Sequence, residues 1–144
     1  MTEVHWQTLR AVMDRVVPPD DFPGAWDAGV GEYLRRQLAR DLKHLALLYD
    51  LGLEAIDAEA RARHGSAFAA LTAAEQDAIL RDVESGRVVA FWPVEPGRFF
   101  RMLVEHVQEG FYADPGNGGN RDGVAWRMIG YGTGPQDEAT HADV

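Results

Sequence analysis

The sequence contains no cysteine, so the chain cannot form disulfides, use a thiolate nucleophile, or hold zinc or iron–sulfur clusters through sulfur. Serine is scarce as well. Only Ser66 and Ser85 are present, and neither lies in a Gly-x-Ser-x-Gly sequence. That sequence forms the strained turn that exposes a catalytic serine, so its absence argues against a serine hydrolase of that kind.

Long apolar segments are also missing. No stretch approaches the ~18 uninterrupted apolar residues that a membrane-spanning helix requires. The N-terminal sequence MTEVHWQTLRAVMDR lacks the basic start and apolar region of an export signal. As given, the chain is expected in the cytoplasm without membrane insertion. A periplasmic location is expected if an export signal was trimmed before Met1.

Basic residues are outnumbered by acidic ones. The 14 Lys and Arg residues face 23 Asp and Glu residues, which gives a formal net charge of -9. Such a chain is repelled by a phosphate backbone, so no nucleic-acid partner is expected. With 144 residues, of which 46% are hydrophobic, the chain has the size and composition of one globular domain.

Apolar residues recur at helical spacing through most of the chain. A first helix is predicted by an apolar stripe that ends before Pro18-Pro19: Leu9, Val12, Met13 and Val16. The longest helix is predicted from about Asp27 to about Asp50. Gly52 is expected to break or kink the chain before a further helix over 54–63, in which Arg61 and Arg63 are interpreted as solvated.

Two later helices have clear sequence signals. Thr72 and Glu75 have the spacing of a capping box, so a helix is predicted to begin there and to end at Gly86. Another is predicted after Pro96 and ends near Asp114-Pro115, with an apolar face of Phe99, Phe100, Leu103, Val104, Val107 and Phe111. The RVVAFW sequence between them is interpreted as an extended linker, because a single strand has no partner.

A short final helix or turn is expected over 124–129. The prediction is therefore an all-α protein: a single compact domain of five or six helices over residues 1–133, with a Gly/Asn-rich C-terminal loop. Residues 134–144 are predicted to form a polar, flexible tail.

Two residue pairs have the spacing that metal ligands on a helix can have. Asp41 and His44 are three residues apart, as are His106 and Glu109, so each pair can share a helix face. A di-iron bundle uses Glu-x-x-His twice with two more glutamates. Here one pair contains Asp, the other runs in reverse order, and both are predicted to lie beside the apolar stripes. We interpret them as surface pairs and predict no metal site.

The segment DPGNGGN at 114–120 resembles a phosphate-binding loop only superficially, because no strand precedes it and no lysine follows it. Its glycines permit positive φ angles, and its asparagines can pair with free backbone groups. We interpret it as a structural loop that ends a helix. Aromatic residues gather around it: Phe111, Tyr112, Trp126 and Tyr131, with Phe91 and Trp92 upstream.

Two blocks follow a known pattern: VVPPDDFPGAWDAGVGEYL at 16–34 and FFRMLVEHVQEGFYADPGNGGNRDGVAWRMIGY at 99–131. The segments YDLGLEAIDAEARARHGSAF and LTAAEQDAILRDVESG lie between them in the same order. Together they resemble the gluconate 2-dehydrogenase subunit 3 family, over nearly the whole chain. One departure is Asn117, which stands where the family loop Asp-Pro-x-Tyr-Gly-Gly-Asn has tyrosine.

The resemblance implies a role rather than a reaction. The family's small subunit is a dedicated partner and maturation factor. Its large subunit, a flavoprotein of the glucose–methanol–choline (GMC) type, holds FAD and oxidises the sugar. Family members often carry a twin-arginine signal, which this sequence lacks. The chain is therefore expected to hold no cofactor itself, to be non-catalytic, and to bind and stabilise an FAD-containing subunit of a sugar or polyol dehydrogenase.

The contact surfaces are expected in segments 18–30 and 111–131, whose motif residues helix packing explains least. The predicted interface residues are Phe22, Trp26, Tyr112, Asn117, Asn120, Trp126 and Tyr131. Structural roles in loops are predicted for Pro23, Gly24, Asp114, Pro115, Gly118 and Gly119.

Two other hypotheses stay open. In the first, the chain is a free-standing small-molecule-binding or enzymatic helical domain, with five polar residues converging in a pocket: Asp20, Asp21, His106, Glu109 and Asn120. In the second, it is a helical homodimer with a structural role. Sedimentation of the isolated protein at several concentrations separates the homodimer from a subunit of a larger enzyme.

Overall fold

The computed structural model describes residues 1–19 and 23–113, and this part of the chain is helical and without strands. Its elements are α1 (Glu3–Val16), α2 (Val30–Ala39), the 3₁₀-helix η1 (Lys43–Leu45), α3 (Ala46–His64), the 3₁₀-helix η2 (Phe68–Ala70), α4 (Ala73–Glu84) and α5 (Pro96–Phe111). The prediction of an all-α fold with five or six helices is confirmed.

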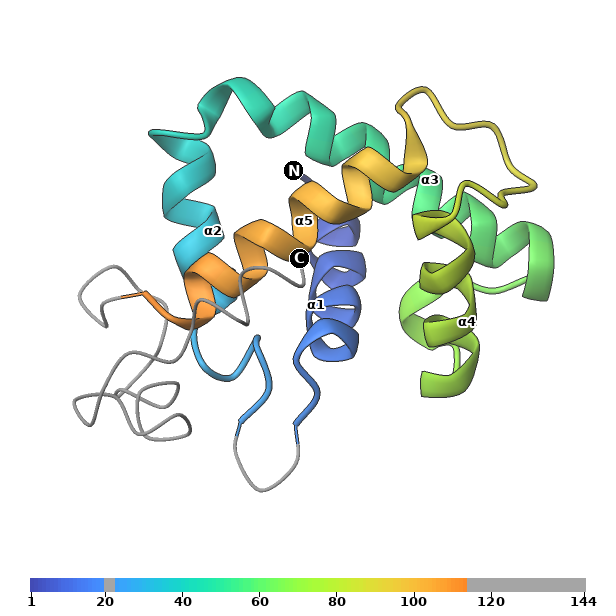
Figure 1. Ribbon diagram of the computed structural model, residues 1–144, viewed down its shortest axis with the longest axis horizontal. Coiled ribbons are helices and arrows are strands. Elements are labelled where there is room, and N and C mark those ends of the chain that lie inside the picture. The colour runs from blue at the N-terminus through green and yellow to red at the C-terminus, as the bar shows by residue number, and fades with distance from the viewer. Residues whose placement is uncertain (20–22, 114–144) are drawn as a thin grey trace.

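Helix α5 crosses the molecule and connects its two ends (Figure 1). Near its start, the backbone of Gly97 lies against the carbonyl of Glu84, the last residue of α4. Near its end, Gly110 lies against Val30 and Tyr33 of α2. Helix α1 packs against α3, α4 and α5. This arrangement places the α1–α2 region and the α4–α5 connection at opposite ends of α5.

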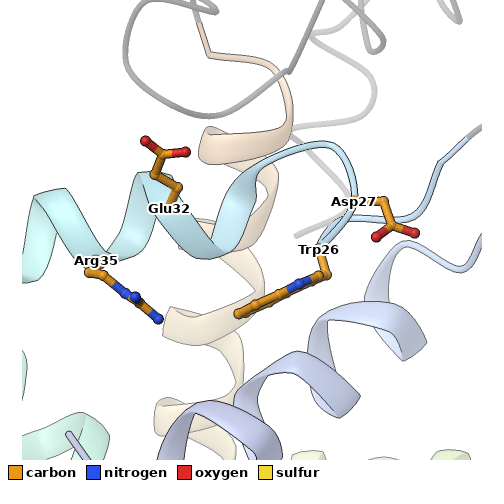
Figure 2. A pocket seen from close by; sticks show the side chains of 4 residues that line it. All are labelled: Trp26, Asp27, Glu32 and Arg35. Atoms are coloured by element: carbon orange, nitrogen blue, oxygen red, sulfur yellow. The ribbon is translucent and has the colours of Figure 1, made fainter.

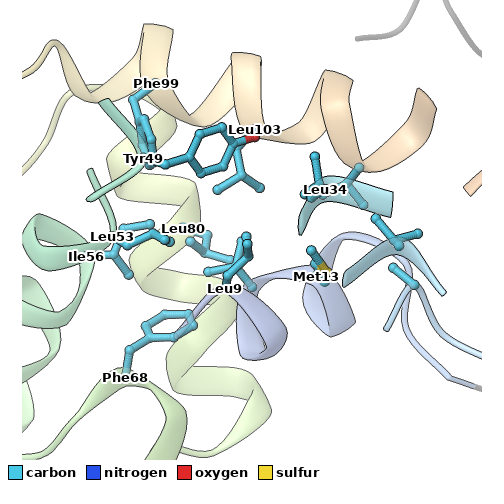
Figure 3. Packing of buried hydrophobic residues seen from close by; sticks show 14 of the residues in the cluster. Leu9, Met13, Leu34, Tyr49, Leu53, Ile56, Phe68, Leu80, Phe99 and Leu103 are labelled. Atoms are coloured by element: carbon cyan, nitrogen blue, oxygen red, sulfur yellow. The ribbon is translucent and has the colours of Figure 1, made fainter. Parts of the chain in front are cut away.

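The core is formed by apolar side chains from all five helices and η2 (Figure 3). Fully buried members include Leu9, Met13, Leu34, Tyr49, Ile56, Phe68 and Leu103. Burying one such side chain stabilises the fold by about 1.5–3 kcal/mol. Residues Leu9, Val12 and Met13 of the predicted first stripe are all completely buried, which confirms that helix and its orientation.

The boundaries of α4 are those that the sequence predicts. The Thr72 hydroxyl accepts a hydrogen bond from the Glu75 backbone N–H, and the Glu75 carboxylate accepts one from the Thr72 N–H. The bond from the Thr72 backbone N–H to the carboxylate lowers the pKa of Glu75. At the other end, Gly86 has a φ of 78°. Glycine adopts this left-handed conformation without steric cost, so the helix ends there.

The predicted long helix over 27–50 is wrong. Gly29 has a φ of 98°, so α2 begins only at Val30. Arg40 leaves the helical conformation with a φ of -130° and a ψ of -99°, and the Leu42 N–H then donates to the Gln37 carbonyl. Because apolar residues still recur at helical spacing across this turn, the pattern alone gave no sign of the interruption.

Gly52 does not break the chain, contrary to the prediction. Helix α3 continues through it from Ala46 to His64. A Cβ atom at Gly52 would lie 2.3 Å from Cε1 of the buried Phe99 ring in α5. The missing side chain therefore allows the aromatic ring to pack directly against the α3 backbone.

The linker between α4 and α5 has no regular secondary structure, as predicted for RVVAFW at 87–92. Helix α5 ends at Phe111, slightly before the predicted end. The predicted final helix over 124–129 and the polar tail over 134–144 lie outside the described residues. Among the helices that are described, none combines the length and apolar character needed to span a bilayer.

Candidate functional site

The segment before α2 forms a tight turn that fixes the position of Trp26. The Ala28 N–H donates to the Gly24 carbonyl, and the Val30 N–H donates to the Ala25 carbonyl. Ala25 and Ala28 are completely buried, whereas Trp26 is half-buried between them. The turn thus directs two small residues into the core and leaves one tryptophan partly at the surface.

The Trp26 indole is held by contacts on several sides. A Cβ atom at Gly31 would lie 2.4 Å from Cζ3 of the indole, so the ring rests on the α2 backbone. The Arg10 guanidinium lies 5.3 Å from the ring centroid, within the range of a cation–π contact. Burial raises the pKa of nearby Asp14, and a hydrogen bond from the Trp26 backbone N–H partly opposes this.

A second arginine–tryptophan pair lies beside the first. The Arg35 guanidinium of α2 lies 4.5 Å from the ring centroid of Trp6 in α1. Trp6 and Arg10 are four residues apart on α1, so they share a helix face. We call the four residues Trp6, Arg10, Trp26 and Arg35 the arginine–tryptophan surface.

Beside this surface lies an open hollow of about 410 Å³ lined by Trp26, Asp27, Glu32 and Arg35. The Trp26 indole and the Arg35 side chain point toward one another across it (Figure 2). An indole flanked by charged groups of both signs suits a partner that offers apolar and polar groups together.

The predicted interface residue Tyr112 follows the end of α5. Its ring packs edge-on against Phe111 with centroids 5.3 Å apart, and it is partly buried. Because the end of α5 packs on the start of α2 through Gly110 and Tyr33, Tyr112 and Trp26 belong to the same end of this helix pair. This placement alone does not bring the two aromatic side chains into contact.

Two predicted loop residues, Pro23 and Gly24, are described. Pro23 is exposed, whereas Gly24 is buried. A Cβ atom at Gly24 would lie 2.8 Å from the Val17 carbonyl oxygen. Eleven residues named in the predictions lie outside the described residues: Asp20, Asp21, Phe22, Asp114, Pro115, Asn117, Gly118, Gly119, Asn120, Trp126 and Tyr131. Their predictions stay predictions.

The placement of His106 beside the apolar stripe is wrong. His106 is only 9% exposed, and its Nδ1 lies 2.7 Å from the Tyr49 hydroxyl in the core. Burial lowers the pKa of His106 and raises that of Tyr49. Glu109, three residues later, is exposed. The imidazole thus joins α5 to α3 instead of forming a surface pair with Glu109.

The other candidate pair, Asp41 and His44, lies in the turn around η1, and both residues are exposed. The predicted long helix would place them one turn apart on a regular helix, and the structure does not. Within residues 1–19 and 23–113, no group of three or more histidine and acidic side chains is arranged to hold a metal ion.

Sequence reasoning missed Glu59, whose carboxylate is completely buried. One oxygen accepts hydrogen bonds from the Val89 N–H at 2.9 Å, the Ala90 N–H at 2.7 Å and the Trp92 indole N–H at 3.1 Å. The other oxygen accepts one from Arg63 at 3.0 Å. A signal was present, because Glu59 interrupts the apolar side of α3 between Ile56 and Ala60.

The prediction that Arg63 is simply a solvated helix residue is wrong. Besides Glu59, it donates to the Asp82 carboxylate at 2.7 Å and to the Arg87 carbonyl at 2.8 Å. The bonds from Arg63 and Arg87 lower the pKa of Asp82. Arg61, in contrast, is exposed and pairs with Asp57 in the preceding turn of the same helix. Arg63 therefore connects α3, α4 and the linker that follows α4.

The linker that Glu59 holds presents apolar side chains to solvent. Phe91 is 83% exposed and Val89 is 67% exposed. Next to the linker, a groove of about 530 Å³ is lined by Leu45, Leu48, Val94, Glu95, Arg98, Phe99 and Met102. The described part of the chain thus carries two candidate contact regions, the arginine–tryptophan surface and this linker.

A family model described as gluconate 2-dehydrogenase subunit 3 matches residues 3–134. Comparison with curated proteins gives no match, and comparison with solved structures gives none. The family match covers the five helices and both blocks that carry the sequence resemblance. The chain therefore belongs to the gluconate 2-dehydrogenase subunit 3 family.

Proposed function

We propose that this chain is the non-catalytic small subunit that binds and stabilises the FAD-containing catalytic subunit of a sugar or polyol dehydrogenase. The family name supports a place in a dehydrogenase complex. The observation that carries the proposal is the arginine–tryptophan surface, in which each indole is half-buried and faced by a guanidinium group.

Tryptophan and arginine are the side chains that most often dominate binding energy at protein interfaces. Here the side chains are already supported by contacts within the chain, since Trp26 rests on Gly31 and Arg35 lies over Trp6. A preformed surface loses little side-chain entropy on binding, so more of the contact energy appears as affinity. The hollow beside Trp26 offers a place for a side chain of the partner.

The alternative of a free-standing enzyme finds less support in the described residues. Its proposed imidazole, His106, is buried and bonded to Tyr49. Its proposed carboxylate, Glu109, is exposed to solvent one helix turn later. A catalytic acid or base must reach the reacting atom within hydrogen-bond distance, whereas Nδ1 of this buried imidazole is already hydrogen-bonded to Tyr49.

In this proposal FAD and the reacting sugar belong to a partner of the GMC flavoprotein type, and this chain acts by binding. A protein that binds only the folded form of another stabilises that form by mass action. The chain would thereby raise the yield of folded, FAD-loaded catalytic subunit without touching the substrate.

Co-expression with a flavoprotein dehydrogenase subunit encoded by a neighbouring gene tests the proposal. We expect the two chains to elute together from gel filtration and the flavoprotein to carry more FAD than when expressed alone. Separate elution, with equal FAD content and equal sugar oxidation in the two preparations, would show that the proposed function is wrong.

A matched pair of charge reversals tests the surface itself. Arg35→Glu replaces the guanidinium over Trp6, whereas Arg40→Glu makes the same change at an exposed residue at the end of α2. We expect Arg35→Glu to weaken the complex about tenfold or more, and Arg40→Glu to have a much smaller effect. Equal effects would mean that general charge, not this surface, governs binding.

A further inference from the structure

The linker between α4 and α5 is held in one conformation by a buried charge. Glu59 accepts hydrogen bonds from the backbone of Val89 and Ala90 and from the side chain of Trp92. Moving a carboxylate out of water is costly, and an apolar residue of similar size is often as stable or more so. A buried carboxylate at Glu59 makes sense if its role is to keep the linker in one conformation and not only to fill the core.

The exposure of the linker side chains alternates along residues 88–95. Val88, Ala90, Trp92 and Val94 are partly buried, and the residues between them are exposed. Three of these inner side chains pack against the core: Val88, Trp92 and Val94. This is the pattern of an extended segment with one inner and one outer side.

The outer side of such a segment is normally polar. Here the first three outward residues are apolar: Val89, Phe91 and Pro93. Among the described residues, Phe91 is the most exposed large apolar residue. An aromatic side chain that a fixed backbone holds in solvent does not stabilise the fold of the isolated chain. It has the properties of an interface residue that inserts into a pocket of a partner.

The charge around the linker indicates what kind of surface the partner presents. Residues 81–101 carry four arginines and three acidic residues, whereas the whole chain has a net charge of -9. Two of the three carboxylates are engaged within the chain: Asp82 by Arg63 and Arg87, and Glu95 by the Arg98 backbone N–H. The guanidinium groups of Arg98 and Arg101 form no ion pair within the described residues.

We propose that Val89, Phe91 and Pro93 form a preorganised docking segment that inserts into an apolar pocket of the catalytic subunit, bordered by carboxylates that pair with Arg98 and Arg101. This inference rests on the proposed function and identifies a second contact region. The groove lined by Leu48, Val94 and Met102 continues the apolar surface beyond the segment. Glu59 acts as a positioning residue, because it holds the segment without touching the partner.

The first test measures binding of the full-length chain to the co-expressed flavoprotein subunit. Phe91→Ala removes the exposed ring, Phe91→Leu keeps an apolar side chain, and Val4→Ala removes an exposed apolar side chain from α1. We expect Phe91→Ala to raise the Kd about tenfold or more, Phe91→Leu to raise it less, and Val4→Ala to change it less than twofold. Since Phe91 is exposed, all three variants should fold.

The second test concerns Glu59. In Glu59→Gln, an NH₂ group replaces one of the two carboxylate oxygens, and the side chain keeps its size. We expect faster hydrogen exchange at Val89 and Ala90 and a higher Kd for the flavoprotein, with the exchange of α1 unchanged. Binding and exchange equal to the parent chain would overturn the positioning role. If this variant does not fold, the Phe91 series alone decides whether the segment docks.

The outcomes separate this inference from the proposed function. If the parent chain forms the complex and Phe91→Ala binds equally well, the docking segment is refuted while the subunit role stands. If the parent chain forms no complex, the subunit role fails and the inference fails with it. If Phe91→Ala instead dissociates a homodimer and leaves flavoprotein binding intact, the occupant is a second copy and the inference is overturned.

Discussion

The Tyr49 hydroxyl and the His106 imidazole form a 2.7 Å hydrogen bond that joins α3 to α5 inside the core. Their rings are stacked, with centroids 5.8 Å apart and an interplanar angle of 20°. Replacing Tyr49 by Phe leaves the buried imidazole nitrogen without this partner. We expect a loss of about 1–3 kcal/mol in the free energy of unfolding, measured by urea denaturation.

Tyr33→Phe is the control for this change. Tyr33 is half-buried, and its hydroxyl makes no hydrogen bond within the described residues. The same substitution there should change the free energy of unfolding by less than about 0.5 kcal/mol. Equal losses at both positions would contradict a structural role for the Tyr49–His106 bond.

The same imidazole makes stability depend on pH. Burial lowers the pKa of His106 below its ordinary value of 6.5, although nearby Glu105 partly opposes the shift. Between the lowered folded pKa and the ordinary unfolded pKa, the unfolded chain binds more protons, so the free energy of unfolding falls as the pH falls. The contribution of His106 is complete above the unfolded pKa and declines below it.

We therefore expect the parent chain to lose more stability between pH 7.5 and pH 5.5 than a His106→Gln variant, which cannot titrate there. Urea midpoints at the two pH values give the comparison. If the variant shows the same pH dependence as the parent chain, other titratable groups cause the loss of stability.

Two glycines that contact aromatic rings should differ in their tolerance of a methyl group. At Gly52 a Cβ atom would lie 2.3 Å from the ring of Phe99, which is 2% exposed and surrounded by the core. At Gly31 it would lie 2.4 Å from Trp26, which is half-buried and has space on the side of the hollow. Overpacking of a core costs about 1–3 kcal/mol, so we expect Gly52→Ala to reach that range or exceed it.

Gly31→Ala should cost less, because the indole can move outward. Thermal unfolding of the two variants ranks them directly. If Gly31→Ala proved the more destabilising, Trp26 would be held as rigidly as a core residue, and the hollow beside it would not accommodate a shift.

Arg63 and Arg61 occupy the same helix but should contribute differently to stability. Arg63 pairs with the fully buried Glu59, whereas Arg61 pairs with Asp57 and is itself 60% exposed. Arg63→Ala leaves a buried carboxylate without its cation, which we expect to cost about 1.5–3 kcal/mol in the free energy of unfolding. Arg61→Ala should cost below about 1 kcal/mol, as is usual for exposed pairs.

Chemical denaturation at low and moderate salt gives the measurement. The loss for Arg63→Ala should persist in salt, since a buried pair is screened little. A loss that disappears in salt would mean that the Glu59 carboxylate is reached by water and does not depend on Arg63.

Helix boundaries could be predicted where a local chemical signal marks them. The capping box of Thr72 and Glu75 and the left-handed Gly86 both lie at the ends of α4, as expected. The end of α2 could not be predicted in this way. Leu42 and Leu45 keep the helical spacing of apolar residues while the backbone turns at Arg40, so the periodicity is the same with or without the break.

Side-chain roles depended on partners that are distant in the sequence. His106 lies on the apolar side of α5, but its bond to Tyr49 requires α3 to be placed first. Glu59 bonds to residues about 30 positions later, and no spacing rule predicts such a contact. The motif predicts Trp26 as an interface residue, but its contacts with Arg10 and Gly31 follow only from the packing of α1 and α2.

The most direct test of the subunit role is the melting temperature of the FAD-loaded catalytic subunit, measured as the purified chain is added. By mass action, a chain concentration of 100 times the Kd should stabilise the flavoprotein by about 2.7 kcal/mol, so its melting temperature should rise steadily with added chain. Phe91→Ala and Arg35→Glu should shift this rise to higher concentrations. A melting temperature that does not change at any concentration of the parent chain would contradict the proposed function.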